Sequence, residues 1–205
     1  MKRFSVLLFA VILILCSCGT ADGPEGTYAA SDGDTSLSVI MDDGYCLIDA
    51  ANEQDGKTAS AAVGGKYTLD NDTVVIEIKE GELKGQRFEF LYNKSKGSLT
   101  NTSDNTVYEK QTVKDEVPDG MYAYKKDSES YVLTIDGESC TLEVHSVNKN
   151  GEEADAVETG KVDVSGNTVE IKMDDKNYKF IYAAEANVLM DTSDGRMYEE
   201  TEMED

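Results

Sequence analysis

The chain has 205 residues, of which 29% are charged, and its acidic residues outnumber its basic ones so far that the formal net charge is -22. Because the sequence contains no basic cluster, we exclude nucleic acid as a partner. It contains one histidine and no arrangement of histidine and cysteine typical of a transition-metal site or a nucleophilic triad. We therefore expect no catalytic residues, no metal site and no cofactor.

The first 17 residues are typical of an export signal. A basic start, Met1-Lys2-Arg3, precedes an apolar run from Phe4 to Leu15, which is shorter than the roughly 20 apolar residues that a membrane-spanning helix needs. The residues that follow, Leu15-Cys16-Ser17-Cys18, resemble the lipobox of bacterial lipoproteins. The resemblance implies cleavage after Ser17 and lipidation of Cys18, with residues 18–25 as the lipidated cysteine and its tether. Plain secretion is the alternative.

A lipid anchor would place the protein on the extracytoplasmic face of the cell membrane. Several acyl chains on Cys18 give stable attachment. Cleavage removes Lys2 and Arg3 and moves the formal charge to -24. This charge disfavours contact with anionic lipid headgroups, so we expect the rest of the chain to stand away from the membrane surface.

The remainder of the chain is a tandem repeat. Its only two prolines open the phrases Pro24-Glu25-Gly26-Thr27-Tyr28-Ala29 and Pro118-Asp119-Gly120-Met121-Tyr122-Ala123, which lie 94 positions apart. Cys46 and Cys140 share this offset. A fixed period of this kind defines the domain organisation. We predict one domain over residues 26–110, a solvated linker over 111–119, a second domain over 120–201 and an acidic tail over 202–205.

Apolar residues alternate with polar ones in both repeats, as in Val169-Glu170-Ile171-Lys172-Met173, and this period of two indicates β-strands. The first repeat contains strand-like runs near Gly26, Leu37, Cys46, Tyr67, Val74, Phe88, Leu99 and Val107. Turns rich in Asp, Asn and Gly separate them, which is typical of an antiparallel meander. Eight short strands can close a barrel, so we predict an all-β protein with two tandem barrels. The alternative is one larger β-sandwich or barrel built from both repeats.

Each repeat opens with Gly-x-Tyr and closes with Tyr-Glu, at Tyr108-Glu109 and Tyr198-Glu199. Together with the meander, these motifs resemble the small lipocalin-like domains of bacterial lipoproteins, with Tyr in place of the usual Trp. The resemblance implies two lipocalin-like barrels and allows a small apolar ligand inside them. A barrel of eight short strands has an interior that side chains can fill. We expect it to be filled by the bulky residues Tyr67, Leu69, Phe90, Tyr92, Phe180 and Tyr182.

Cys46 and Cys140 are in phase with inward-facing residues, so we predict that both are small core hydrophobes of separate domains. An inter-domain disulfide is the alternative, since it is permitted outside the cytoplasm. His145 alternates with Val144, which indicates a solvated surface position.

We expect a non-catalytic binding or interaction module of the cell envelope that contacts a protein or a glycan. Exposed tyrosines such as Tyr45 and Tyr124 are suitable contact residues. The alternative is a lipocalin-like carrier of a small apolar ligand, and a less favoured one is a hydrolase that uses two carboxylates. Calcium is a weak possibility because carboxylates crowd into the turns at 32–34, 70–72 and 191–194, where turn geometry is the competing explanation.

Overall fold

The structure is a computed structural model that describes residues 23–79, 81 and 83–201. The expected signal peptide, Cys18 and the acidic tail lie outside the described residues. All regular elements of the described part are β-strands, sixteen in total. The described residues contain no helix of the length and hydropathy that crossing a membrane requires.

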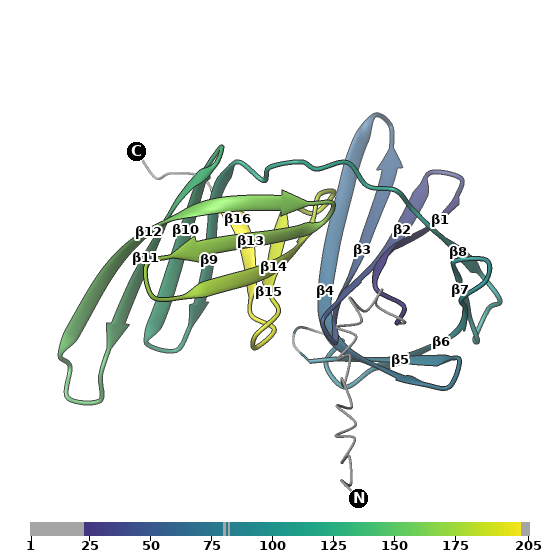
Figure 1. Ribbon diagram of the computed structural model, residues 1–205, viewed down its shortest axis with the longest axis horizontal. Coiled ribbons are helices and arrows are strands. Elements are labelled where there is room, and N and C mark those ends of the chain that lie inside the picture. The colour runs from purple at the N-terminus through teal and green to yellow at the C-terminus, as the bar shows by residue number, and fades with distance from the viewer. Residues whose placement is uncertain (1–22, 80, 82, 202–205) are drawn as a thin grey trace, which may run out of the picture.

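The first eight strands form a closed antiparallel barrel in which chain neighbours pair and β1 pairs with β8 (Figure 1). Closure pairs the first strand with the last, although the long strand β4 pairs with β5 only from Gly65 to Asp70. The prediction of eight strands in the first repeat is confirmed, and the strands are β1 (Gly26–Asp32), β2 (Thr35–Asp42), β3 (Tyr45–Gln54), β4 (Lys57–Asp70), β5 (Thr73–Ile78), β6 (Arg87–Asn93), β7 (Ser98–Asn101) and β8 (Val107–Lys110).

The second repeat forms a barrel of its own with the same order of pairing, closed between β9 and β16. Its strands are β9 (Gly120–Lys126), β10 (Glu129–Asp136), β11 (Ser139–Val147), β12 (Glu153–Ser165), β13 (Thr168–Met173), β14 (Asn177–Ala183), β15 (Val188–Asp191) and β16 (Met197–Thr201). The prediction of two tandem meander barrels is confirmed, and the alternative of one larger sheet structure is wrong.

Local sequence explains where the strands turn and bend. Asp43 and Gly44, between β2 and β3, have φ angles of 50° and 81°, as a two-residue hairpin turn with positive φ at both positions requires. Gly65 of β4 pairs with Ile78 of β5, and a Cβ atom on Gly65 would approach the Glu77 carbonyl oxygen to 2.7 Å. Glycine is therefore needed where the backbones of these two strands come this close.

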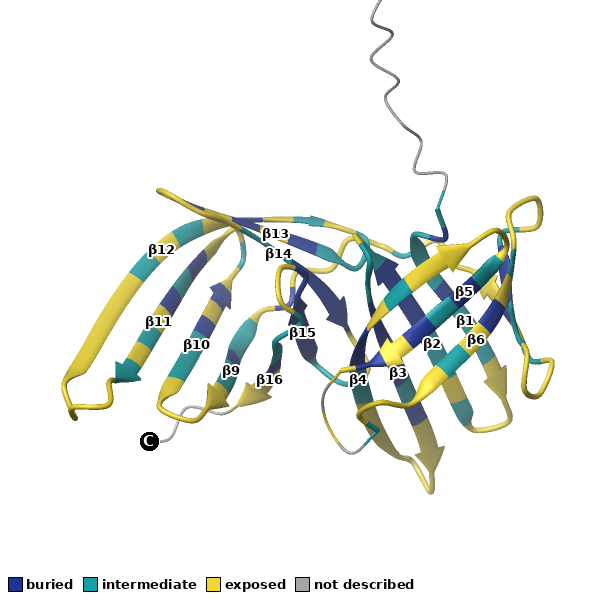
Figure 2. Ribbon diagram, turned by 90° about the horizontal axis from the view of Figure 1, so that it is seen from below, coloured by how far each residue is buried: buried dark blue, intermediate teal, exposed yellow. Residues whose placement is uncertain are grey.

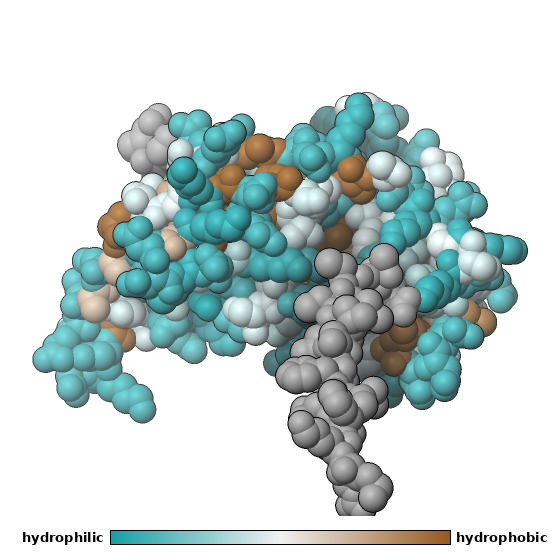
Figure 3. Space-filling view, viewed as in Figure 1, coloured by the Kyte–Doolittle hydropathy of each residue, from teal (hydrophilic) through white to brown (hydrophobic). Residues whose placement is uncertain are grey.

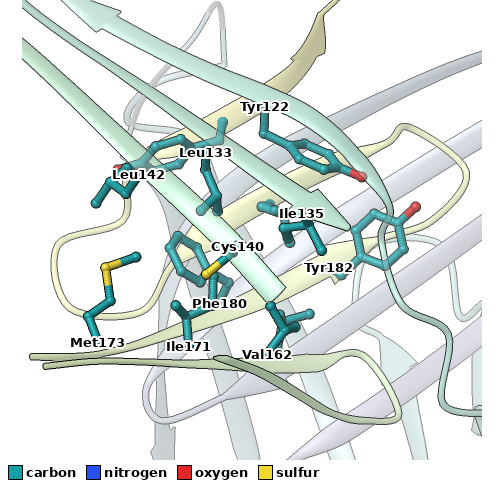
Figure 4. Close-up of a cluster of buried hydrophobic side chains, with 13 residues drawn as sticks. Tyr122, Leu133, Ile135, Cys140, Leu142, Val162, Ile171, Met173, Phe180 and Tyr182 are labelled. Atoms are coloured by element: carbon teal, nitrogen blue, oxygen red, sulfur yellow. The ribbon is translucent and has the colours of Figure 1, made fainter. Parts of the chain in front are cut away.

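Each barrel encloses a hydrophobic core. Figure 4 shows the core of the second barrel, in which Tyr122, Phe180 and Cys140 belong to one cluster of buried side chains. The tyrosines of the two Gly-x-Tyr motifs, Tyr28 and Tyr122, are 0% and 1% exposed.

Five of the six residues that we expected inside the barrels belong to the two cores: Tyr67, Phe90, Tyr92, Phe180 and Tyr182. Leu69 was wrongly expected there. It lies next to the last residue of β4, where the strand reaches the rim of the barrel, and 38% of it is exposed.

The linker between the barrels runs along the surface. Most of its residues are exposed, as expected, but two of its aspartates hold turns of the second barrel. Asp115 accepts a hydrogen bond from the backbone N–H of Gly166, and Asp119 accepts one from Gly137, each at 2.7 Å. The linker is thus fixed against the barrel that follows it.

Candidate binding surfaces

The two barrels share a third hydrophobic cluster, which joins their outer surfaces. Figure 1 shows the two barrels side by side. The first barrel contributes the outer side of β2, β3 and β4, here called the receiving face. The second contributes the outer side of β14, β15 and β16, here called the inserting face. Strand alternation explains the burial, because Phe180 and Tyr182 point into the barrel while Ile181 and Ala183 point out of it. β15 is therefore buried on both sides, as its dark colour in Figure 2 shows.

The apolar contact at this junction is tight. Leu47 of the receiving face and Ile181 and Met190 of the inserting face are all 0% exposed. A Cβ atom on Gly64 would lie 2.8 Å from the sulfur of Met190 and 2.9 Å from that of Met197. The absence of a side chain at Gly64 is what allows the two methionines to approach β4.

Polar contacts surround the apolar junction. The Nζ atom of Lys179 lies 2.7 Å from Oδ2 of Asp42, and the hydroxyl of Thr168 donates to the same oxygen at 3.2 Å. Burial opposes the charge of Lys179, but the hydrogen bond and the charge of Asp42 raise the pKa of Lys179 above its usual value. The hydroxyl of Tyr45 donates to the Ser193 carbonyl oxygen at 3.0 Å. These bonds fix the orientation of one barrel on the other.

One carboxyl group is buried at the junction. Asp49 points outward from β3, is 4% exposed, and its Oδ1 atom has no hydrogen-bond partner. Burial raises the pKa of Asp49 to about 6, opposed by a hydrogen bond from the backbone N–H of Glu185 and assisted by the Glu185 charge. The junction thus contains a carboxyl group that titrates close to neutral pH.

The repeat places a counterpart of the receiving face on the second barrel, and this counterpart is uncovered. Matching the strand pairing of the repeats equates Ile40 with Thr134, Leu47 with Thr141, Gly64 with Thr159 and Asp42 with Asp136. These second-barrel residues line a hollow of about 870 Å³ along β10–β13, here called the open groove. Lys161, Lys172 and Asp174 also line it, as do Cys140 and Met173 of the second core. At the counterpart positions of Ile40 and Leu47 the open groove carries threonines, so it is polar there where the receiving face is apolar.

The first barrel likewise carries an uncovered counterpart of the inserting face, here called the open inserting face. On the outer side of β6–β8, Ile181 corresponds to Leu91, Met190 to Thr100, Met197 to Val107 and Lys179 to Glu89. Leu91 and Val107 are 51% and 50% exposed. Most of the surface in view in Figure 3 is hydrophilic, with small hydrophobic areas between hydrophilic residues.

The two tyrosines that we expected as exposed contact residues are engaged within the molecule. Tyr45 packs against the junction cluster and lies under the Nζ atom of Lys66, 4.7 Å from its ring centre. Tyr124 packs against the core of the second barrel, with its ring 6.0 Å from that of Tyr131. The expectation failed because alternation alone does not show that an outward or rim position is covered by a neighbouring element.

The two cysteines of the barrels are buried free thiols. Cys46 is 0% exposed and Cys140 is 5% exposed, and they lie in different cores. Burial raises the pKa of Cys46 to about 12, although a hydrogen bond with the Gly65 backbone acts in the opposite direction. The prediction of small core residues is confirmed, and the alternative of an inter-domain disulfide is wrong.

The remaining candidates have structural explanations. His145 is exposed, as expected, and its Nδ1 atom lies 2.5 Å from Oδ1 of Asp155.

In the turn at 191–194, Asp191 accepts a hydrogen bond from the backbone N–H of Ser193 at 2.7 Å, and Asp194 accepts one from the backbone N–H of Arg196 at 3.0 Å. These bonds have ordinary Asx-turn geometry. Within residues 23–79, 81 and 83–201, no three His, Cys, Asp or Glu side chains are grouped as metal ligands.

Sequence reasoning missed the junction, although a signal was present. Ile181-Tyr182-Ala183 and Val188-Leu189-Met190 interrupt the alternation with apolar residues on both sides of a strand, and such runs indicate a strand covered on both faces. Comparison of the chain with protein-family models and with curated proteins finds no match.

Proposed function

We propose that this chain is a lipid-anchored lipoprotein on the extracytoplasmic face of the cell membrane that acts as a non-catalytic binding module of the envelope. The partner is a protein, which the module contacts through the outer faces of its lipocalin-like barrels. One observation carries the proposal. The receiving face of the first barrel already binds a protein surface within this chain, and its counterpart on the second barrel is the open groove.

The chemistry of the open groove supports recognition of a protein surface. The hydroxyl groups of Thr134, Thr141 and Thr159 offer donors and acceptors, and Lys161 and Asp136 offer charges of both signs. A non-obligate interface as a whole is about as polar as the rest of a protein surface, so these side chains are compatible with one.

Packing inside the barrels supports binding on the outside rather than in a lipocalin-like interior. In the first core, the rings of Phe90 and Tyr108 meet edge to face with centres 5.6 Å apart, and the equivalent rings of Phe180 and Tyr198 repeat this distance.

Native mass spectrometry of the chain beginning at Gly19 tests the carrier alternative. A bare mass agrees with binding outside the barrels, and a releasable apolar molecule would contradict it.

The anchor rests on the lipobox-like sequence. Cys18→Ala removes the acylated thiol, so we expect this variant to move from the membrane fraction to the soluble fraction of cells that express the full chain. A variant that remains in the membrane fraction after a high-salt wash would contradict lipid anchoring.

Photo-crosslinking in cells tests the groove. A photoreactive amino acid at Thr141 is expected to form a covalent adduct with a protein partner. The same amino acid at Asn150, which is exposed in the turn between β11 and β12, serves as the control and is expected to form none. The proposal fails if positions 134, 141 and 159 all give no adduct beyond that of the control.

A further inference from the structure

We propose that the protein that occupies the open groove is a second copy of this chain, which docks through the open inserting face of its first barrel. The inference rests on the proposed function of the groove. The contact would repeat, between two molecules, the junction that joins the two barrels within one molecule. Each copy has one groove and one open inserting face, so the association is head to tail.

The apolar residues left exposed on the surface support this contact. Five large hydrophobic side chains are exposed among the described residues: Leu69, Leu91, Val107, Val117 and Val157. Three of them occupy counterpart positions of the junction. Leu91 and Val107 correspond to Ile181 and Met197 of the inserting face, and Val157, which is 66% exposed, corresponds to Ala62 beside the receiving face. Burial of exposed apolar side chains is the main favourable term in association.

Three side chains differ in volume between the covered junction and the proposed contact, and the differences compensate one another. In the covered junction, Gly64 leaves room for the long side chains of Met190 and Met197. In the proposed contact, the groove carries the larger Thr159 in place of glycine. The open inserting face carries the shorter Thr100 and Val107 in place of the methionines. The gain of volume from Gly64 to Thr159 thus balances the loss of volume at the two methionine positions, which favours close packing at this point of the contact.

Charge is the term that opposes association. Lys179 and Asp42 attract each other at 2.7 Å in the covered junction, whereas their counterparts, Glu89 and Asp136, are both acidic. Lys161 and Lys172, which also line the groove, supply positive charges there. The repulsion predicts that the association is weak at low ionic strength and strengthens as salt screens the acidic pair.

This acidic pair provides a gain-of-function test. In the chain beginning at Gly19, which retains all sixteen described strands, Glu89→Lys restores the lysine–aspartate pair of the covered junction. Sedimentation velocity over a concentration series is expected to give a dissociation constant for Glu89→Lys about tenfold lower than for the unmodified protein. Glu153→Lys, which makes the same change of charge at an exposed position outside both faces, is the control and is expected to change it less than twofold.

Loss-of-function variants complete the test. Val107→Asp and, separately, Thr141→Asp are expected to abolish the association of the Glu89→Lys protein, one by altering the inserting face and the other the groove. Both positions are at the surface, and unchanged thermal unfolding shows that the fold is intact. If Glu89→Lys sediments as a monomer over the whole series, or if either loss variant with an intact fold associates as before, the inference is overturned.

The photo-crosslink at Thr141 separates this inference from the proposed function. An adduct of the chain with itself supports both. An adduct with a different protein only, combined with monomeric Glu89→Lys, leaves the proposed function standing and overturns self-association. Absence of any adduct from the groove overturns both.

Discussion

Lys179 of the second barrel places its Nζ atom 2.7 Å from Oδ2 of Asp42 in the first barrel, and 34% and 15% of these side chains are exposed. The pair is the polar contact that borders the apolar junction, and Thr168 shares the same carboxylate oxygen. Because Asp42 is mostly withdrawn from water, removing its partner leaves a carboxylate whose solvation is incomplete. The ion pair therefore selects one orientation of the two barrels.

Lys179→Met is expected to lower the free energy of unfolding by about 1 kcal/mol, an estimate reduced for the partial exposure of the lysine. Denaturant unfolding followed by circular dichroism measures the change. Lys172→Met breaks the exposed pair with Asp163, whose atoms lie 3.7 Å apart, and this control is expected to cost less than about 0.5 kcal/mol. Equal effects of the two substitutions would show that Lys179 does not act through a partly buried pair.

Gly64→Leu is expected to disrupt the junction, because even a Cβ atom at this position would lie 2.8 Å from the Met190 sulfur. Overpacking of a closed contact costs roughly 1–3 kcal/mol. The measurement is thermal unfolding, with Thr159→Leu at the uncovered counterpart as the control, where the added side chain meets solvent. A Gly64→Leu protein as stable as the control would mean that the barrels separate without cost.

The stability of the junction is expected to depend on pH through Asp49. The pKa of this carboxyl is raised from 3.8 to about 6 in the folded protein, so the folded state takes up a proton before the unfolded state does. Its contribution is fully present below pH 3.8 and is lost as pH rises through about 6. The change between these limits is on the order of 3 kcal/mol.

Asp49→Asn removes this titration, so its unfolding free energy is expected to vary less between pH 4 and 7 than that of the unmodified protein. Glu143→Gln, at the exposed counterpart position, controls for the loss of one carboxylate. If the two variants show the same dependence on pH, the burial of Asp49 has no influence on stability.

The thiols of Cys46 and Cys140 are expected to resist an aromatic disulfide reagent at pH 8 in the folded protein and to react fully in guanidinium chloride. Burial keeps the reagent away from both thiols. It also lowers the fraction of thiolate, which is the reactive form, because it raises the pKa of Cys46 to about 12 and also raises the pKa of Cys140. The chain beginning at Gly19 contains only these two cysteines, so absorbance reports them directly. Rapid reaction of the native protein would contradict their placement in the cores.

The sequence was sufficient to predict the barrels because their determinants are local. Alternation in Val169–Met173 defines an inner and an outer face, and pairs such as Asp43-Gly44 determine where a hairpin turns. The junction depends on contacts between residues more than 100 positions apart, such as Leu47 with Ile181. Local apolar runs indicate that β14 and β15 are covered, but no local rule states which surface covers them, so the receiving face was not predicted and Tyr45 was expected to be free.

The junction also means that the two repeats are not interchangeable along the chain. The contact joins different sides of the two barrels, the receiving face of one and the inserting face of the other, so the direction of the polypeptide determines which pair of faces meets. A gene in which the order of the repeats is reversed would encode a chain whose internal junction brings Glu89 toward Asp136. The differences between the two repeats thus give this protein a polarity that neither barrel has alone.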